Sequence, residues 1–280
     1  MSPLDAAALV RTLYERDEDR FFDDPAGVPM VDPPIVAVAD AADPWFARLR
    51  ALLGAFYWTP DDALRTAFGD VTARSVICWS LPVSAVAREA NGRERELPAR
   101  PWAYVRTFGA AVNRRLRHDV TAALLARGAA AVAPADCPAH TVADRPATGL
   151  PANWSERHTA FVAGLGTFGL SGGLITARGI AHRLGSVVTD LPLPATERPY
   201  GDDPFALCLR TARGTCGACI DRCPAGSIGE RPDQRDKTAC RDWAYRVVAQ
   251  RGRSRFDWDG TYGCGLCQTA VPCESCNPMA

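Results

Sequence analysis

The stretch Cys216-Gly-Ala-Cys219-Ile-Asp-Arg-Cys223-Pro224 decides how the last quarter of this 280-residue chain folds. Nine of the eleven cysteines lie between Cys208 and Cys276, so the thiols form a site and are not scattered core residues. Clustered thiolates favour soft metals, and repeated Cys-x-x-Cys pairs are typical of zinc sites or of iron–sulfur clusters.

The dipeptide Cys223-Pro224 favours iron–sulfur clusters over zinc. In two-cluster ferredoxin sequences, the cysteine before proline leaves the first cluster and ligates the second. The alternative is zinc, held by the pairs Cys216/Cys219 and Cys264/Cys267. Those pairs are far apart for a zinc ribbon, and zinc would leave three further cysteines of the segment without a role. The segment therefore predicts two [4Fe-4S] clusters.

Three stretches carry a resemblance to a known family. The cysteine segment is similar to the double [4Fe-4S] domain of epoxyqueuosine reductases and their relatives, the reductive dehalogenases. Upstream, Glu156-Arg157 and the run 163–169 (Ala-Gly-Leu-Gly-Thr-Phe-Gly) resemble the family's Glu-Arg helix and Gly-Leu-Gly-Trp-x-Gly loop, and the run 184–194 resembles the strand before the clusters. The tRNA-reducing members carry a C-terminal helical-repeat extension, and we expect a shortened member without one.

Both cysteine motifs depart from the family pattern. Arg213 occupies the place of the first cysteine, and the nearest thiol upstream is Cys208; Val271 stands before Pro272 where the family has cysteine. Cluster one is therefore expected on Cys208, Cys216, Cys219 and Cys273, and cluster two on Cys223, Cys240, Cys264 and Cys267. Cys276 is the spare thiol, and the choice between it and Cys273 stays open.

The resemblance implies an α+β fold: a nitroreductase-like α/β cofactor and substrate domain over residues 1–195, then a ferredoxin-like cluster domain over 196–280. It also implies a cobalamin between the two, with flavin as the alternative cofactor. Residues Gly164, Gly166, Thr167, Gly169 and Ser171 are the candidates for cofactor contact. A tight turn between core elements explains the same glycines equally well.

Proton delivery is where the resemblance fails. The tRNA reductases have an aspartate six residues before the Glu-Arg pair, and here that position is Leu150. The remaining titratable candidates are Glu156 and His158, with Tyr104 a weaker one. A first-turn glutamate is more often a cap or dipole partner than a catalyst. Epoxyqueuosine in tRNA is therefore not the expected substrate.

We expect an oxidoreductase that passes low-potential electrons through two clusters to cobalamin and reduces a small organic substrate. The alternatives are an electron-transfer protein and a corrinoid-handling protein. The expected electron donor is a ferredoxin or flavodoxin. The basic run 231–255 is either an ordinary solvated face, as most such runs are, or the docking face for this donor. Because 32 basic residues balance 32 acidic ones, nucleic acid is not expected as a partner.

Hydrophobic periodicity and cap residues predict alternating helices and strands before the cysteine segment. The expected helices span 6–22, 43–53, 63–68, 101–127 and 155–164, and the expected strands 35–38, 75–81, 129–133, 174–176 and 186–189. The polar stretch 83–100 is expected to be a loop or lid, and 192–203 a linker. Without a secretory h-region or a membrane-length apolar run, a cytoplasmic location without membrane contact is expected.

Overall fold

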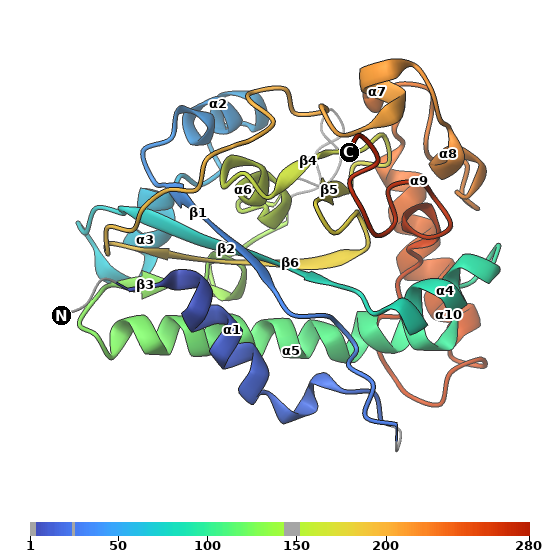
Figure 1. Ribbon diagram of the computed structural model, residues 1–280, viewed down its shortest axis with the longest axis horizontal. Coiled ribbons are helices and arrows are strands. Elements are labelled where there is room, and N and C mark those ends of the chain that lie inside the picture. The colour runs from blue at the N-terminus through green and yellow to red at the C-terminus, as the bar shows by residue number, and fades with distance from the viewer. Residues whose placement is uncertain (1–3, 24–25, 143–151) are drawn as a thin grey trace.

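A four-stranded antiparallel sheet lies at the centre of the computed structural model, which describes residues 4–23, 26–142 and 152–280 (Figure 1). The strand order is β1 (Ile35–Asp40), β2 (Ser75–Pro82), β6 (His182–Thr189) and β3 (Ala131–Val132). In register, Cys78 of β2 lies opposite Ala37 of β1 and Ser186 of β6. Every residue of β2 is buried, because helices cover both faces of the sheet.

Side chains of β2 alternate between two hydrophobic cores, as the two-residue period of a strand requires. Ile77 and Trp79 pack with α1 (Ala6–Arg16) and α5 (Arg100–Leu125) on one face. Val76 and Cys78 pack on the opposite face with α2 (Pro44–Leu53), α3 (Pro60–Phe68) and α6 (Glu156–Val162). Burial of a side chain such as Ile77 stabilises the fold by roughly 1.5–3 kcal/mol.

Local capping sets most helix starts where the sequence predicts them. Thr59 forms a capping box with Asp62, and Ser155 caps α6 by accepting a hydrogen bond from the His158 amide. The helix expected over 6–22 is shorter, because Asp17 ends α1 and caps the short 3-10 helix Glu18–Arg20. Strand β6 begins four residues before the expected start at Ser186.

The expected loop or lid over 83–100 is wrong, because α4 spans Ala85–Arg93 within it. This helix buries only Ala87 and Asn91, so its sequence lacks an apolar stripe. Asn91 donates to Thr269 Oγ1 at 3.1 Å and accepts from the Ala99 amide at 3.0 Å. Contacts with the C-terminal segment thus stabilise a helix that has no hydrophobic signature of its own.

The C-terminal segment is built from short elements. They are α7 (Leu209–Arg213), α8 (Ala218–Asp221), the 3-10 helices Pro232–Gln234 and Leu266–Gln268, α9 (Lys237–Asp242), a π-helix (Trp243–Val247) and α10 (Val248–Gly252). This segment, orange to red in Figure 1, packs at one end of the sheet beside α4. The two-stranded sheet of β4 (Gly166–Phe168) and β5 (Leu174–Thr176) and a 3-10 helix (Pro134–Asp136) complete the fold.

The expectation of a mixed helix–strand fold is confirmed, in the form of an antiparallel sheet between helices. The nitroreductase-like and ferredoxin-like character of its parts, and the boundary at residue 195, stay predictions. Over the described ranges, none of the helices combines the length and apolar character that a membrane span requires.

Candidate functional site

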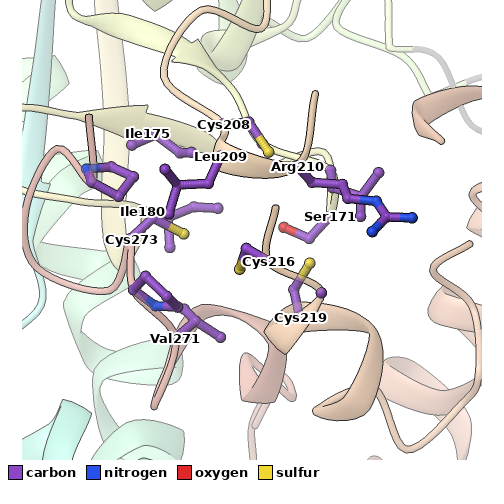
Figure 2. A pocket seen from close by; sticks show the side chains of 15 residues that line it. Ser171, Ile175, Ile180, Cys208, Leu209, Arg210, Cys216, Cys219, Val271 and Cys273 are labelled. Atoms are coloured by element: carbon purple, nitrogen blue, oxygen red, sulfur yellow. The ribbon is translucent and has the colours of Figure 1, made fainter. Parts of the chain in front are cut away.

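Four thiols from three separate stretches line one cavity in the C-terminal segment. They belong to Cys208, Cys216, Cys219 and Cys273. Figure 2 shows these side chains around a common space, with apolar side chains such as Ile175 and Ile180 beside them. These are the four cysteines expected to hold cluster one.

Backbone conformation positions one of these thiols, and a backbone hydrogen bond positions another. Cys216 has a φ of 73°, a left-handed conformation that non-glycine residues rarely adopt. Such outliers concentrate at functional sites, where the surrounding structure holds them. The Cys273 carbonyl accepts a hydrogen bond of 2.8 Å from the Ile180 amide, which joins the C-terminal loop to the connection between β5 and β6.

The thiols of this first group are costly to ionise together. Burial, and then the neighbouring Cys208 and Cys216, raise the pKa of Cys219 to about 11. Burial and the same group of thiols raise the pKa of Cys273 to about 12. Bound iron would offset this repulsion, since metal ligation stabilises the thiolate form.

The second group of thiols opens into a large cleft. Its members are Cys223, Cys240, Cys264 and Cys267, and all four line a space of about 960 Å³ between the sheet, α5 and the C-terminal segment. Burial, and then neighbouring Cys240 and Cys223, raise the pKa of Cys264 to about 11. Burial and the other three thiols also raise the pKa of Cys267. These are the four cysteines expected to hold cluster two.

Polar groups already approach two sulfurs of this second group. The Ser227 amide donates to Cys223 Sγ at 3.4 Å, and the Ser227 hydroxyl lies 3.2 Å from the same sulfur. Arg235 donates to Cys240 Sγ at 3.7 Å. Hydrogen bonds to ligand sulfurs raise the reduction potential of an iron–sulfur cluster, so these groups suit a cluster ligated here.

The remaining cysteines lie outside both groups. Cys276 is exposed, and its thiol donates to the Pro272 carbonyl at 3.6 Å. Cys78 is buried in β2, and Cys137 lies near Thr66 at the protein's other end. All eleven cysteines are free. Within the described part of the chain, no three His, Cys, Asp or Glu side chains are arranged to hold a single metal ion.

Glu156 reaches the cleft from the first turn of α6. Both carboxyl oxygens are buried, with no well-formed hydrogen bond from any described residue, and Ser186 lies close by. Burial raises the pKa of Glu156 to about 7, and the nearby Arg117 guanidinium limits the rise. The group therefore titrates near neutral pH at the lining of the cleft.

The other two candidates for proton transfer lie away from the cleft lining. His158 packs its ring against Tyr57 and Phe168, and burial lowers its pKa to about 4. Tyr104 packs against Phe108 and other rings on the far side of α5. Leu150 lies outside the described residues.

The glycine-rich run contributes mostly to packing. At Gly166, a Cβ would collide with the Ile175 carbonyl across the β4–β5 pair, and Thr167 Oγ1 accepts from the Leu207 amide at 2.9 Å. Gly164 ends α6 with a φ of 83°. Gly169 lines the first thiol cavity, and Ser171 lines both that cavity and the cleft. Ser171 is thus the candidate from this run that the structure brings to the cleft.

Arg222 is a structural residue that the sequence reasoning missed. Its guanidinium is 6% exposed and donates to the carbonyls of Asn91, Gly92, Glu94, Leu266 and Thr269. These bonds join the end of α4 to the loop that follows Cys267. The only signal in the sequence is the position of this arginine between the ligand-type cysteines Cys219 and Cys223.

Part of the chain is similar in sequence to a known protein. No known protein-family model matches the chain. A curated protein, the epoxyqueuosine reductase of Leadbetterella byssophila, is 31% identical over 119 residues, which make up 40% of this chain and 35% of the relative. The chain thus spans about a third of the length of the curated relative that it matches.

Solved epoxyqueuosine reductases are similar at lower identity. One, crystallised with an epoxyqueuosine-modified tRNA-Tyr stem loop, is 19% identical and has a TM-score of 0.48, covering 96% of this chain and 66% of that chain. The Bacillus subtilis structure, with its catalytic loop swung out of the active site, is 17% identical with a TM-score of 0.47 at the same coverages. With the curated relative, the resemblance to the epoxyqueuosine reductase family that the motifs predicted is confirmed.

Proposed function

We propose that this chain is an iron–sulfur oxidoreductase that carries electrons through two [4Fe-4S] clusters into the cleft. The observation that carries the proposal is the sorting of eight thiols into two groups of four, one in a separate cavity and one open to the cleft. Each cluster, when bound, exchanges single electrons at low potential. The similarity to an epoxyqueuosine reductase supports the same class.

The arrangement gives the electrons a direction. Cys216 of the first group is exposed, so a ferredoxin or flavodoxin can approach it from solvent. The second group faces the cleft, where a substrate would be reduced. Reduction of a double bond takes two electrons, delivered singly through the clusters, and two protons; Glu156 would supply one proton from its buried carboxyl and solvent in the cleft the other.

The size of the cleft favours an enzyme over a bare electron carrier. About 960 Å³ lies at the upper end of small-molecule sites. A cobalamin or a flavin is proposed as the occupant next to the second cluster, and a small organic molecule as the substrate. Ser171 and Glu156 are the residues of the two predicted sets that reach this space.

Nucleic acid is a second candidate substrate, against the expectation from net charge. The balance of 32 basic and 32 acidic residues says nothing about local charge, and seven of the cationic side chains gather around the cleft. A related reductase was solved with a tRNA stem loop. Binding of an RNA stem loop, measured at several salt concentrations, tests this alternative.

The test of the main proposal is the metal content of protein purified without oxygen from cells supplied with iron and cobalamin. We expect a brown protein that absorbs broadly near roughly 400 nm and holds about eight irons. Cys216→Ser and Cys240→Ser should each lose about four irons. Cys276→Ser is the matched control and should keep all of them, since this thiol lies outside both groups.

A colourless, zinc-loaded protein would contradict the proposal. If iron is present, the cofactor extract distinguishes cobalamin from flavin. Turnover of a substrate then separates an enzyme from an electron-transfer or corrinoid-handling protein.

A further inference from the structure

The described residues that line the cleft include more basic than acidic side chains. Among the described residues that line it, seven are Arg or Lys and one, Glu156, is acidic. Glu156 interacts with Arg117, near the middle of α5. Arg106 lies eleven residues earlier on the same helix, about 16 Å along its axis. The charge at the Arg106 end therefore stays uncompensated by this carboxylate.

Two arginines line the cleft near that end, and Arg106 is one of the charges that act on Arg183. Arg106 projects from α5 and Arg183 from the start of β6, and both line the cleft. The Nε atom of Arg183 is buried and has no hydrogen-bond partner among the described residues. Burial, and then repulsion by Arg106, lower the pKa of Arg183 to about 9. Buried charges in proteins are normally paired, so an anion bound beside Arg183 and Arg106 would stabilise the Arg183 guanidinium.

A third donor completes the site. Arg106 donates to the Tyr245 hydroxyl at 3.4 Å, and this hydroxyl keeps its own proton to donate. Tyr245 lies in the π-helix Trp243–Val247, a type of helix that occurs frequently at functional sites. On the other side, the Arg106 side chain packs against Gly263, next to Cys264 of the second thiol group.

We propose that Arg106, Arg183 and Tyr245 form a binding site for an oxoanion, a phosphate or carboxylate, carried by the small molecule that occupies the cleft. The inference rests on the proposed function for the role of the cleft, and it adds the charge class of the ligand. Two planar guanidinium groups match the geometry of such anions. The site would hold the charged end of the ligand beside the second cluster.

A small molecule fits this position better than an RNA backbone does. The Nε atom of Arg183 is buried, whereas nucleic-acid backbones track exposed basic surfaces through many phosphate contacts. A single oxoanion requires only the convergent donors of one pocket.

The test is calorimetric titration of the anaerobic, cluster-loaded chain with inorganic phosphate and with phenyl phosphate. We expect saturable binding that weakens about tenfold or more in Arg106→Gln and in Arg183→Gln, because each removes charged hydrogen bonds to the anion. Arg183→Lys keeps the charge without the fork and should weaken binding less. Arg114→Gln, an exposed site on the same helix, is the charge-matched control and should bind normally.

Several outcomes would overturn the inference: no saturable binding of either phosphate, equal binding by all variants, or arginine-dependent binding of a single-stranded RNA oligonucleotide alone. Titration with FMN and with riboflavin, which differ by the phosphate, shows whether a cofactor supplies the anion. Tighter binding of FMN that depends on the two arginines would support the site, with the flavin phosphate as the anion. The iron content of the same samples separates the two proposals. If the protein binds phosphate but holds no iron, the anion site is supported and the iron–sulfur reductase proposal is contradicted. If it holds iron but binds no phosphate, the reductase proposal is supported and the anion site is contradicted.

Discussion

At the scale of single residues, Arg222 shows how one buried charge connects distant parts of the chain. All three nitrogens that carry its hydrogen bonds end on carbonyls or on Thr269, and no carboxylate takes part. Its role is therefore to saturate backbone acceptors that α4 and the Cys264–Cys267 loop leave unpaired. A lysine has one nitrogen and cannot reach both sides with the same geometry.

We expect Arg222→Met to lower the free energy of unfolding by about 2–4 kcal/mol, since several buried carbonyls lose their donor. Anaerobic thermal melts should show a Tm lower by about 5–10 °C. Arg251→Met is the control, because Arg251 forms an exposed ion pair with Glu96 that contributes little. Equal melting of the two variants would show that the Arg222 contacts do not stabilise the fold.

We expect the free energy of unfolding to depend on pH through Glu156, and the Glu156→Gln variant to lack this dependence. Its pKa is raised from 4.5 to about 7 in the folded chain, so the folded state binds more protons than the unfolded state between these values. Stability from this group is complete below pH 4.5 and is lost as the pH rises through 7. Glu156→Gln mimics the protonated acid and removes the loss, which is on the order of 2–3 kcal/mol.

The measurement is Tm at pH 5 and pH 8. Glu156→Gln should melt close to the native chain at pH 5 and several degrees above it at pH 8. Taking the difference cancels the titration of His158 and His182, whose pKa values burial lowers to about 4. Glu89→Gln, an exposed change on α4, should follow the native chain at both pH values.

At the scale of elements, tertiary contacts decide the features that local sequence does not encode. Helix α3 has its start signal in Thr59, Pro60 and Asp62, and it begins at Pro60, three residues before the expected start at residue 63. Helix α4 has neither a side-chain cap bond nor an apolar stripe, so its residues read as a loop. Its burial depends on Thr269, which lies 178 positions after Asn91, and no local pattern contains that information.

The turn that begins the last 3-10 helix depends on a glycine. Gly265 has a φ of 69°, and a Cβ there would collide with the Trp102 ring of α5. We expect Gly265→Ala to displace Cys264 and Cys267, and so to lose about four irons. Gly201→Ala is the matched control: its φ is 62°, but no atom lies near the added methyl group.

That control should melt about 1–2 kcal/mol less stable from backbone strain alone and keep all its iron. Iron content and Tm, measured on both variants, separate strain from the collision. Full iron in Gly265→Ala would mean that α5 does not position the second thiol group.

At the scale of the whole molecule, the structure brings together thiols that the sequence grouped, and it adds cleft residues that the sequence did not indicate. Cysteine spacing and family resemblance grouped Cys208 with Cys273 across 65 positions, and both line one cavity. The glycine run predicted cofactor contact. In the structure, Gly166 allows the close approach of β4 and β5, and Thr167 accepts a hydrogen bond from the Leu207 amide. A glycine can be required by close backbone packing as well as by a ligand. The sequence did not predict that Arg106 and Arg183 line the same cleft, because only the fold brings α5 and β6 together there.

The thiol segment should depend on its metal more than the sheet does. Its apolar clusters around Leu207 and Val248 are small, and its helices α7 to α10 have four to six residues each, too short to be stable alone. The sheet has an extensive core on each face. Removing iron with a chelator should therefore unfold residues after about 196 and leave the sheet folded.

Limited proteolysis of the iron-loaded and iron-free chains, read by mass spectrometry, measures this difference. Cleavage in the iron-free chain should concentrate between Phe205 and Arg255, while a fragment containing β1 to β6 persists and keeps its strand signal in circular dichroism. Because Arg222 and Arg88 bond α4 to the C-terminal segment, α4 should become sensitive at the same time. Cleavage at the same sites and rates in both forms would place the stability of this segment in its packing, with no contribution from metal.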